Sequence, residues 1–317
     1  MLPSRRPSPN RRGAVDRRGN EKNRTQLEIS TTDLVKEYRG RKVVNGISIN
    51  VKQGEIVGLL GPNGAGKTTT FYMIVGLVKP TRGEILLDGQ DVTRQAMYRR
   101  ARNGIAYLPQ EASVFRNLTV EENLHLVLQL QNLTKAERKE RADALLEDLH
   151  ITRIRHDLGK TLSGGERRRV EIARALAAKP KFILLDEPFT GVDPKAIEDI
   201  ATIIRRLTKS EEKIGILITD HNVEAMLSIM ERVYLIADGQ KRYEGLATNL
   251  LNDPVAQEAY FGQAYGIHRD MARIAAEDEL RRMSHDYDAE PEEVEEQKKS
   301  VADASGKSKE DDDAAAG

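Results

Sequence analysis

A single stretch of eight residues, 61–68, constrains the fold of this chain more than any other. It reads GPNGAGKT and fits the pattern G-x-x-x-x-G-K-[ST]. The apolar run 56–60 before it is typical of a buried parallel strand, and residues 67–77 after it carry apolar side chains at helical spacing. Glycines let backbone N–H groups converge between the strand and the helix, and the helix N-terminus adds partial positive charge there.

The stretch therefore predicts a loop that binds the phosphates of a nucleoside triphosphate such as ATP. Lys67 would reach the β- and γ-phosphates, and the hydroxyl group of Thr68 would bind Mg²⁺. The strand and helix on either side disfavour the alternative, a glycine-rich turn without a ligand. The predicted nucleotide-binding residues of the loop are Gly61, Pro62, Asn63, Gly64, Ala65, Gly66, Lys67, Thr68 and Thr69.

The composition of the 317-residue chain narrows the possible chemistry. It has no cysteine, which excludes disulfides and cysteine nucleophiles, and its six histidines form no cluster in the sequence. The formal net charge is zero, so we expect no direct contact with nucleic acid. No apolar run approaches the roughly 18 residues of a membrane span, and the basic N-terminal segment lacks the apolar core of a signal peptide. We therefore expect a cytoplasmic protein that contacts a membrane only through a partner.

Charge and hydropathy divide the chain into three segments. Residues 1–26 are basic and almost without apolar side chains; we expect a disordered tail, either merely solvated or attracted to anionic lipid. Residues 27–262 alternate strands and helices and form the predicted α/β domain. A helical block at about 111–160 interrupts this alternation and predicts an inserted helical subdomain. Residues 263–317 are charged and acidic, and we expect them to be partly helical and then disordered.

Two later strands are predicted to end at the same crevice as the phosphate loop. The buried run 182–185 leads into Asp186 and Glu187, at the edge where parallel strands present ligand groups. Asp186 would hold Mg²⁺ through water, and Glu187 would lie where an attacking water must be polarised. The strand at 214–219 ends before His221, which would either contact a γ-phosphate or serve as an ordinary structural histidine.

Of three other features, two have both a structural and a functional interpretation. In the segment LSGGE, Ser163 is a good helix cap, and Gly164 and Gly165 permit close approach; this helix start is either a second anion site or a simple cap. Asp193 caps the next predicted helix. The ring of Tyr38 would either stack on adenine or pack across its sheet.

Taken in order, GPNGAGKT, LSGGE, ILLDEP and ITDH resemble the motifs of the ATP-binding cassette (ABC) ATPase subunits, over about residues 27–262. The resemblance implies a P-loop NTPase (RecA-like) core with a mixed sheet, an N-terminal antiparallel β-subdomain and an inserted helical subdomain. Tyr38 matches the adenine-stacking position, Asp186 the aspartate that holds Mg²⁺, and Gln110 the glutamine that senses Mg²⁺ and the transport partner. The catalytic residues that the resemblance implies are Glu187 as base, His221 as switch histidine, and Lys67.

The same family pattern implies a dimer. Ser163, Gly164 and Gly165 match the signature that closes on ATP bound by the opposite subunit, and Asp193 matches the dimer-contact loop. Longer segments, such as YLPQEASVFRNLTVEENL, are similar to the ATP-binding subunits of lipopolysaccharide export transporters. Those proteins form a homodimer beneath two membrane permease subunits, on the cytoplasmic face of the inner membrane, and power the extraction of lipopolysaccharide.

Two alternatives to this function are weaker. ATPase subunits of branched-chain amino acid importers are similar in sequence over many of the same segments. Cassette ATPases that act on ribosomes or DNA usually carry two cassettes or a long coiled-coil insertion, and this chain has neither.

Two details concern particular side chains. The segment FTGVD contains Thr190 where alanine would be more familiar in the family, and we expect this difference to matter little. Phe115 is either an exposed anchor for a permease or part of the helical subdomain's core.

Overall fold

The computed structural model describes residues 26–256 of the chain. The predicted basic tail, the acidic extension and the last part of the predicted short helices up to Phe261 lie outside the described residues. The chain divides into two units, one ending at Ala247 and one beginning at Thr248, and each is considered by itself. Of the second unit, the structure describes most of the 3₁₀-helix η3 (Ala247–Asn252) and the short helix α8 (Pro254–Ala256).

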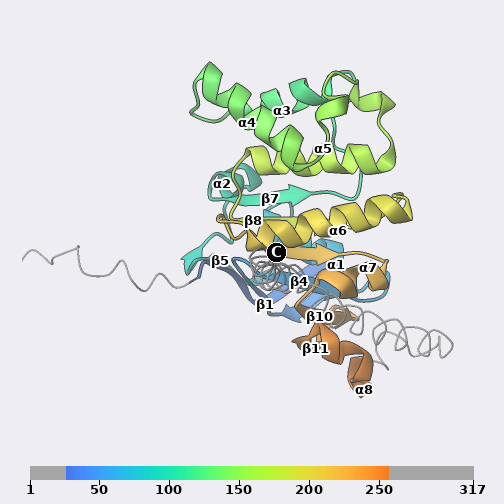
Figure 1. Ribbon diagram of the computed structural model, residues 1–317. Helices are drawn as coiled ribbons and strands as arrows, with labels where there is room; N and C mark the ends of the chain where they lie inside the picture. Colours follow the sequence, from blue (N-terminus) through green and yellow to red (C-terminus); the bar gives the residue numbers. More distant parts are fainter. Residues whose placement is uncertain (1–25, 257–317) are drawn as a thin grey trace, which may run out of the picture. The chain divides into compact units, whose positions relative to one another are not determined.

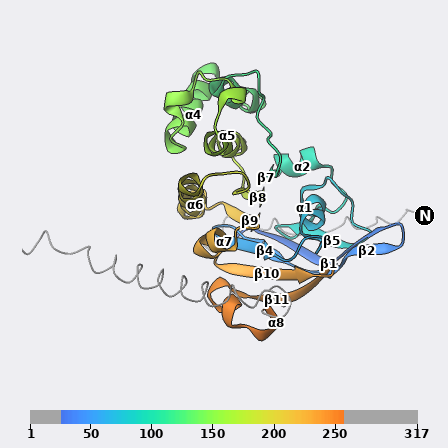
Figure 2. The same ribbon diagram turned by 90° about the vertical axis from the view of Figure 1, so that its right-hand side faces the viewer.

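The first unit begins with an antiparallel sheet, shown in blue in Figures 1 and 2. Its strand order is β2-β1-β5-β6, and β3 also pairs with β1. Arg39 and Gly40 both have positive φ angles, 49° and 80°, which suits the two-residue hairpin between β1 and β2. The strands are β1 (Glu28–Tyr38), β2 (Arg41–Ile47), β3 (Asn50–Lys52), β5 (Arg82–Leu87) and β6 (Gln90–Asp91).

A second, six-stranded sheet forms the core of the unit. Its order is β11-β10-β4-β9-β8-β7, and only the β10–β11 pair is antiparallel. Every residue of β4, β8 and β9 is buried, as expected of strands covered on both faces. The strands are β4 (Ile56–Leu60), β7 (Ile105–Leu108), β8 (Phe182–Asp186), β9 (Gly215–Thr219), β10 (Arg232–Ala237) and β11 (Gln240–Leu246). The predicted α/β fold with a mixed sheet and an N-terminal antiparallel sheet is confirmed.

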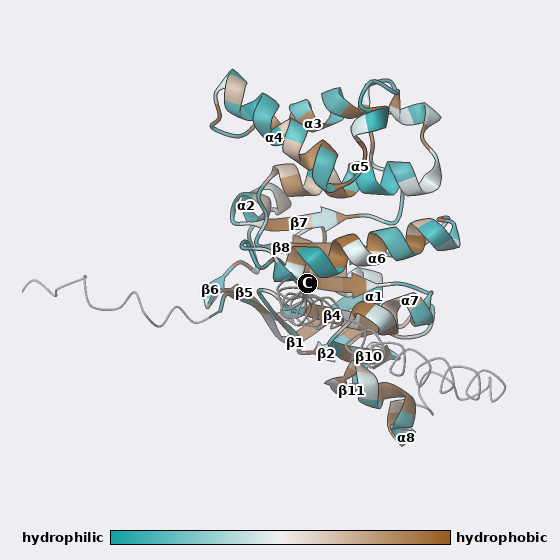
Figure 3. Ribbon diagram, viewed as in Figure 1, coloured by the Kyte–Doolittle hydropathy of each residue, from teal (hydrophilic) through white to brown (hydrophobic). Residues whose placement is uncertain are grey.

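Helices flank the central sheet and also form a separate group. Helices α3, α4 and α5 contact one another, and α5 also contacts α6 (Figure 2). Hydrophilic residues dominate α4, whereas the buried strands β4 and β8 consist mainly of hydrophobic residues (Figure 3). The helices are α1 (Lys67–Val75), α2 (Met97–Arg102), α3 (Val120–Leu128), α4 (Lys135–Asp148), η1 (Thr152–Ile154), η2 (Gly159–Thr161), α5 (Gly164–Ala177), α6 (Pro194–Lys209) and α7 (Val223–Ile229).

The helical block starts later than its composition indicates. Residues 111–119 are not helical, because the first helix begins at the capping box formed by Thr119 and Glu122. Leu130 lies beyond the end of α3 and is 85% exposed. The short helices α2 and α7 were not predicted.

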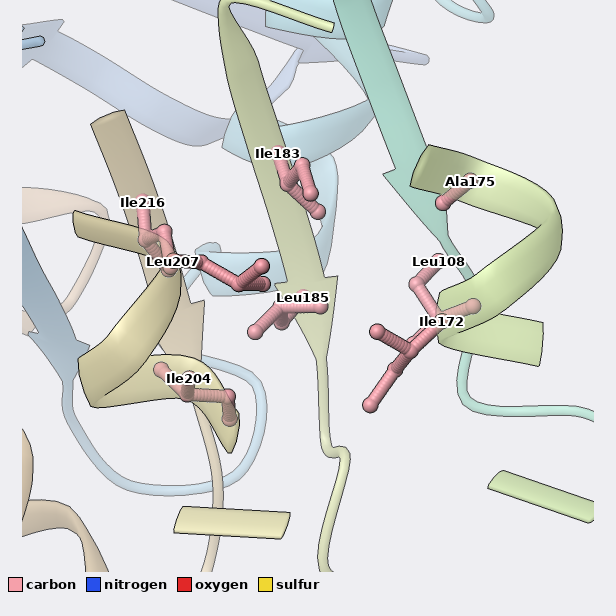
Figure 4. A pocket seen from close by; sticks show the side chains of 8 residues that line it. All are labelled: Leu108, Ile172, Ala175, Ile183, Leu185, Ile204, Leu207 and Ile216. Carbon is pink, nitrogen blue, oxygen red and sulfur yellow. The ribbon is translucent and has the colours of Figure 1, made fainter. Parts of the chain in front are cut away.

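Aliphatic side chains fill the space between the sheet and the helices α5 and α6. Eight of them face one another in Figure 4, and the gap that they leave is too small for a water molecule. This region is therefore packed core rather than a ligand site. The eight residues are Leu108, Ile172, Ala175, Ile183, Leu185, Ile204, Leu207 and Ile216.

Candidate active site

The loop 61–68 joins the carboxyl end of β4 to α1, as predicted. Its glycines have positive φ angles, 153° at Gly61 and 102° at Gly66. A Cβ atom on Gly61 would lie 2.1 Å from the carbonyl oxygen of Ile236, and one on Gly66 would lie 2.6 Å from that of Val43. Only glycine fits at both positions, so the loop backbone stays in close contact with β10 and β2. In the same stretch Pro62, Asn63, Gly64 and Thr68 are exposed, Ala65 is buried and Thr69 is half-buried.

Lys67 places its ammonium group inside this loop. The residue is only 7% exposed, and Nζ donates hydrogen bonds to the carbonyl oxygens of Gly61 (2.6 Å) and Pro62 (3.0 Å). Burial lowers the pKa of Lys67, while the neighbouring carboxylates of Glu187 and Asp186 act in the opposite direction. The lysine thus brings positive charge to the place where the loop meets the two acids.

Asp186, the last residue of β8, carries one buried oxygen with no partner. Its Oδ2 accepts a hydrogen bond from the hydroxyl group of Tyr107 (3.1 Å), but its Oδ1 is buried and unpartnered. Burial raises the pKa of Asp186, because the charged form is poorly solvated. An orphaned carboxylate oxygen is costly unless a cation or a donor reaches it, so Asp186 fits a divalent metal ion. Among residues 26–256, no three His, Asp or Glu side chains could hold a metal ion together. Hydroxyl and phosphate oxygens would therefore have to complete the shell.

Three side chains from different parts of the chain converge on the carboxylate of Glu187. Nε2 of His221 lies 2.7 Å from Oε1, Nε2 of Gln110 donates to Oε2 at 2.6 Å, and the hydroxyl group of Thr190 donates to Oε2 at 3.2 Å. Glu187 itself is only 8% exposed. The structure thus brings together Gln110, Glu187 and His221, which the sequence analysis assigned to one site from separate motifs.

The strand register explains why His221 reaches Glu187. Asp186 pairs with Thr219 across the parallel strands β8 and β9, so the residues that follow each strand emerge side by side. Glu187 then turns sharply: its φ angle is 48°, in the left-handed region, and its N–H group donates to the carbonyl oxygen of Thr219 (2.7 Å). A non-glycine residue in this conformation is strained, and such strain is concentrated at functional sites.

Thr190, the residue that replaces the more familiar alanine, lies in the site. Its hydroxyl group contacts the carboxylate of Glu187 directly, three residues earlier in the same turn. A pattern search had no reason to select it, because the family motif carries alanine here. The signal that could have found it is its spacing of three residues from Glu187, which brings the two side chains together only if the chain turns.

The signature segment lies at the start of α5, against the loop before α6. Ser163 caps α5 and forms a capping box with Glu166, which is the structural interpretation considered above. A Cβ atom on Gly164 would lie 2.6 Å from the carbonyl oxygen of Gly191. Asp193 caps α6 by accepting a hydrogen bond from the N–H group of Ala196 (3.0 Å). The signature and the Asp193 loop therefore share one surface.

Tyr38 lies at the end of β1, where the hairpin turns into β2. Its ring is 47% exposed, with Nζ of Lys36 4.8 Å from the ring centre. An exposed ring is not a buried cross-strand packing residue. Its neighbour strand β2 contacts the phosphate loop at Val43, so the ring is on the strand pair that borders the loop.

Phe115 is likewise exposed rather than part of the helical core. Its ring is 49% exposed and lies under the guanidinium of Arg174, 4.8 Å from the ring centre. The side chain of the buried Asn123 bonds to both the N–H group (2.9 Å) and the carbonyl oxygen (3.1 Å) of Phe115. The backbone is thus fixed while the ring remains available for contact.

A buried ion pair on α5 was missed by the sequence analysis. Arg168 is 5% exposed and Glu171 is 3% exposed, and Nη1 of Arg168 lies 3.0 Å from Oε2 of Glu171. Glu171 also accepts a hydrogen bond from the N–H group of Ser113 (2.7 Å). Arg168 donates in addition to the carbonyl oxygens of Pro109, Asp186 and Pro188. The pair ties α5 to the segment after β7 and to the end of β8. The charged residues RRRVE within an apolar helix face are the signal that could have revealed it.

Comparison with known proteins agrees with this geometry. The family described as ABC transporter matches residues 44–190. Among solved structures, the ADP conformation of MJ1267, an ATP-binding cassette of an ABC transporter, superposes with a TM-score of 0.67 at 29% identity, covering 75% of this chain and all of that one. The dimeric ATP-binding cassette MJ0796 bound to ADP and Pi gives a TM-score of 0.62 at 28% identity, with coverage of 69% and 98%.

The chain belongs to the ABC transporter family, as an ATP-binding subunit that hydrolyses ATP. In particular, it is similar to the lipopolysaccharide export system ATP-binding protein LptB of Haemophilus influenzae. The two are 53% identical over 238 residues, which are 75% of this chain and 98% of that protein.

Proposed function

We propose that this chain is the ATPase subunit of a lipopolysaccharide exporter, in which it uses Mg²⁺ and ATP to power extraction from the inner membrane toward the outer membrane. The observation that carries this proposal is the 53% identity to the export protein over 98% of that protein's length. The acidic site at the ends of β8 and β9 supplies the chemistry that such an activity needs.

The phosphate loop and Lys67 hold the triphosphate. Backbone N–H groups of residues 63–68, at the N-terminus of α1, would donate to the phosphate oxygens, and the Lys67 ammonium would neutralise the β- and γ-phosphates. Thr68, Asp186 and Gln110 would hold Mg²⁺. The ion would supply charge neutralisation and a fixed orientation of the phosphates. Catalysis is then mainly positioning and electrostatic stabilisation.

Glu187 acts as the base in this scheme. An ionised carboxylate offers about four acceptor positions, and three donors already contact Glu187, which leaves room for one water proton. The water oxygen attacks the γ-phosphorus, its proton passes to Glu187, and the bond between the γ-phosphorus and the bridging oxygen breaks. ADP leaves with that oxygen. His221 stabilises charge at the γ-phosphate.

Each motif occurs once in the sequence, and in the family pattern the signature of a subunit serves the ATP of its partner. Hydrolysis would therefore require two chains. Ser163, Gly164 and Gly165 of one subunit would close on ATP held by the loop of the other, and Asp193 would contact the opposite subunit. The dimeric cassette bound to ADP and Pi supports this arrangement. Adjacent placement of the signature and the Asp193 loop makes one continuous dimer surface.

The subunit would work beneath two permeases, as a peripheral protein on the cytoplasmic face of the inner membrane. Within residues 26–256, no helix is long and apolar enough to cross a membrane. We expect membrane contact to come through the permeases, by way of the segment from Gln110 to Arg116.

For Phe115 we expect a loss of permease binding without a loss of stability. Replacing Phe115 by alanine removes an exposed aromatic anchor, the kind of side chain that dominates binding energy at interfaces. Recovery of the permeases with the tagged subunit should fall at least fivefold, while the melting temperature stays the same. Leu130→Ala, which removes another exposed apolar side chain of the same subdomain, is the matched control. Unchanged recovery by the Phe115 variant would contradict the role.

Tyr38→Ala is expected to weaken ATP binding and to spare phosphate binding. Loss of base stacking costs about 1–3 kcal/mol, which is roughly 5- to 150-fold in Kd. Titration with ATP and, in parallel, with inorganic tripolyphosphate separates the two contributions. Tyr38→Phe keeps the ring and should bind ATP almost normally. Equal losses for both ligands would show that the ring supports the loop rather than the base.

Co-purification from the native membrane tests the transport function itself. The tagged subunit is solubilised gently, and the proteins and lipids recovered with it are identified. Two permeases with bound lipopolysaccharide would support the proposal. Recovery of importer permeases would leave the proposed ATP hydrolysis unchanged and would overturn lipopolysaccharide as the transported substrate.

A further inference from the structure

We propose that Thr190 is a positioning residue. It keeps the Glu187 carboxylate oriented when the hydrogen bond from Gln110 to that carboxylate lengthens. The inference rests on the proposed role of Glu187 as the base. It concerns a residue that departs from the usual family motif and therefore lies outside the set of motif residues.

The contacts divide the two carboxylate oxygens among three donors. Oε1 faces His221, whereas Oε2 accepts from both Gln110 (2.6 Å) and Thr190 (3.2 Å). An ionised carboxylate only accepts hydrogen bonds, so the Thr190 hydroxyl must be the donor. With alanine at position 190, Gln110 would be the one donor to Oε2 among the contacts described here.

The donors are carried by different parts of the chain. Gln110 follows β7 and is 77 residues from Glu187 in the sequence. Thr190 lies in the same turn as Glu187, and its N–H group donates to the carbonyl oxygen of Glu187 (3.3 Å). Phe189, which lies between Glu187 and Thr190 in the sequence, donates its N–H group to the buried carboxylate of Asp220 (2.8 Å). Thr190 therefore moves with Glu187, whereas Gln110 moves with its own segment.

This difference matters if Gln110 serves the metal. Its amide donates to Oε2 through Nε2 and would bind Mg²⁺ through its own oxygen, so a movement of its segment toward the metal would change the 2.6 Å contact. When that contact lengthens, the Thr190 hydroxyl still holds Oε2. The carboxylate then keeps one side-chain conformation as the water is deprotonated.

Two substitutions at position 190 separate the effect of the hydroxyl group from the effect of the side-chain shape. Thr190→Val keeps the branched shape and removes the donor, and Thr190→Ser keeps the donor. We expect Thr190→Val to lower kcat about threefold with KM for ATP within twofold, because one of several bonds to the base is lost. Thr190→Ser should stay within about 1.5-fold of the unchanged protein in kcat.

The decisive measurement combines Thr190→Val with Gln110→Ala. If the two donors share the holding of Oε2, each partly compensates for the loss of the other, and the double variant should lose at least threefold more in kcat than the product of the two single losses. Simple multiplication of the single losses would overturn the proposal. So would a Thr190→Ser variant as slow as Thr190→Val, or a rise in KM in place of a fall in kcat.

A failure of the proposed function gives a different result. If Glu187→Gln hydrolysed ATP at the normal rate, Glu187 would not be the base, whatever the Thr190 variants do. If Glu187→Gln is inactive but the two losses at Gln110 and Thr190 multiply, only the positioning role of Thr190 is overturned.

Discussion

Glu187→Gln should reduce steady-state ATP hydrolysis by at least about 100-fold while ATP binding persists, because a general base contributes roughly 10²- to 10⁴-fold to a rate. The amide has nearly the shape of the carboxylate but cannot accept the water proton. Its nucleotide contacts remain, since the phosphate loop and Lys67 are untouched. ATP should therefore hold two subunits together in a closed dimer that does not turn over.

Phosphate release and size-exclusion chromatography with Mg²⁺ and ATP measure these two effects. Glu198→Gln, which changes an exposed glutamate in α6, is the matched control and should remain monomeric and active to the same degree as the unchanged protein. Normal turnover by Glu187→Gln would remove the carboxylate from the mechanism. Loss of ATP binding would instead show that its charge is needed to assemble the site.

Arg168→Met should lower the free energy of unfolding by about 3–5 kcal/mol, the usual cost of removing one partner from a buried ion pair. The carboxylate of Glu171 would remain 3% exposed without its cation, and the carbonyl oxygens of Pro109 and Pro188 would lose a donor. Methionine fills most of the volume, so the loss is mainly electrostatic.

Denaturant titration of Arg168→Met, of the control Arg167→Met and of the double variant Arg168→Met with Glu171→Gln tests this account. Arg167→Met, at the neighbouring half-buried position of α5, should change stability by less than about 0.5 kcal/mol. Adding Glu171→Gln to Arg168→Met removes the uncompensated charge and should restore part of the stability. A loss below about 1 kcal/mol for Arg168→Met would mean that the pair contributes little.

The phosphate loop could be predicted from the sequence because its function depends on adjacent residues. Residues 61–68 carry the turn, the cation and the hydroxyl group within one strand–turn–helix unit. The end of β8 could be predicted for the same reason, since four apolar residues before Asp186 already indicate a buried strand.

Features that depend on tertiary contacts were not accessible in this way. The convergence of Gln110 and His221 on Glu187 depends on the register of β8 against β9 and on the path of the chain after β7. The contact of Thr190 with Glu187 depends on the turn that brings its hydroxyl group to 3.2 Å from the carboxylate. The start of α3 directly after its cap at Thr119 was also not predicted, because the helical composition of the whole block at about 111–160 concealed this local cap.

One consequence of the α5 helix is mechanical. The signature glycines begin this helix, and Arg174, which covers the ring of Phe115, lies ten residues after Gly164 on the same 14-residue helix. Ten residues of α-helix span about 15 Å, so a tilt of about 10° at the signature end displaces Arg174 by about 3 Å. If the signature closes on a neighbour's γ-phosphate as we propose, the helix would act as a lever arm that transmits this closure to Phe115, the residue proposed to contact the permease.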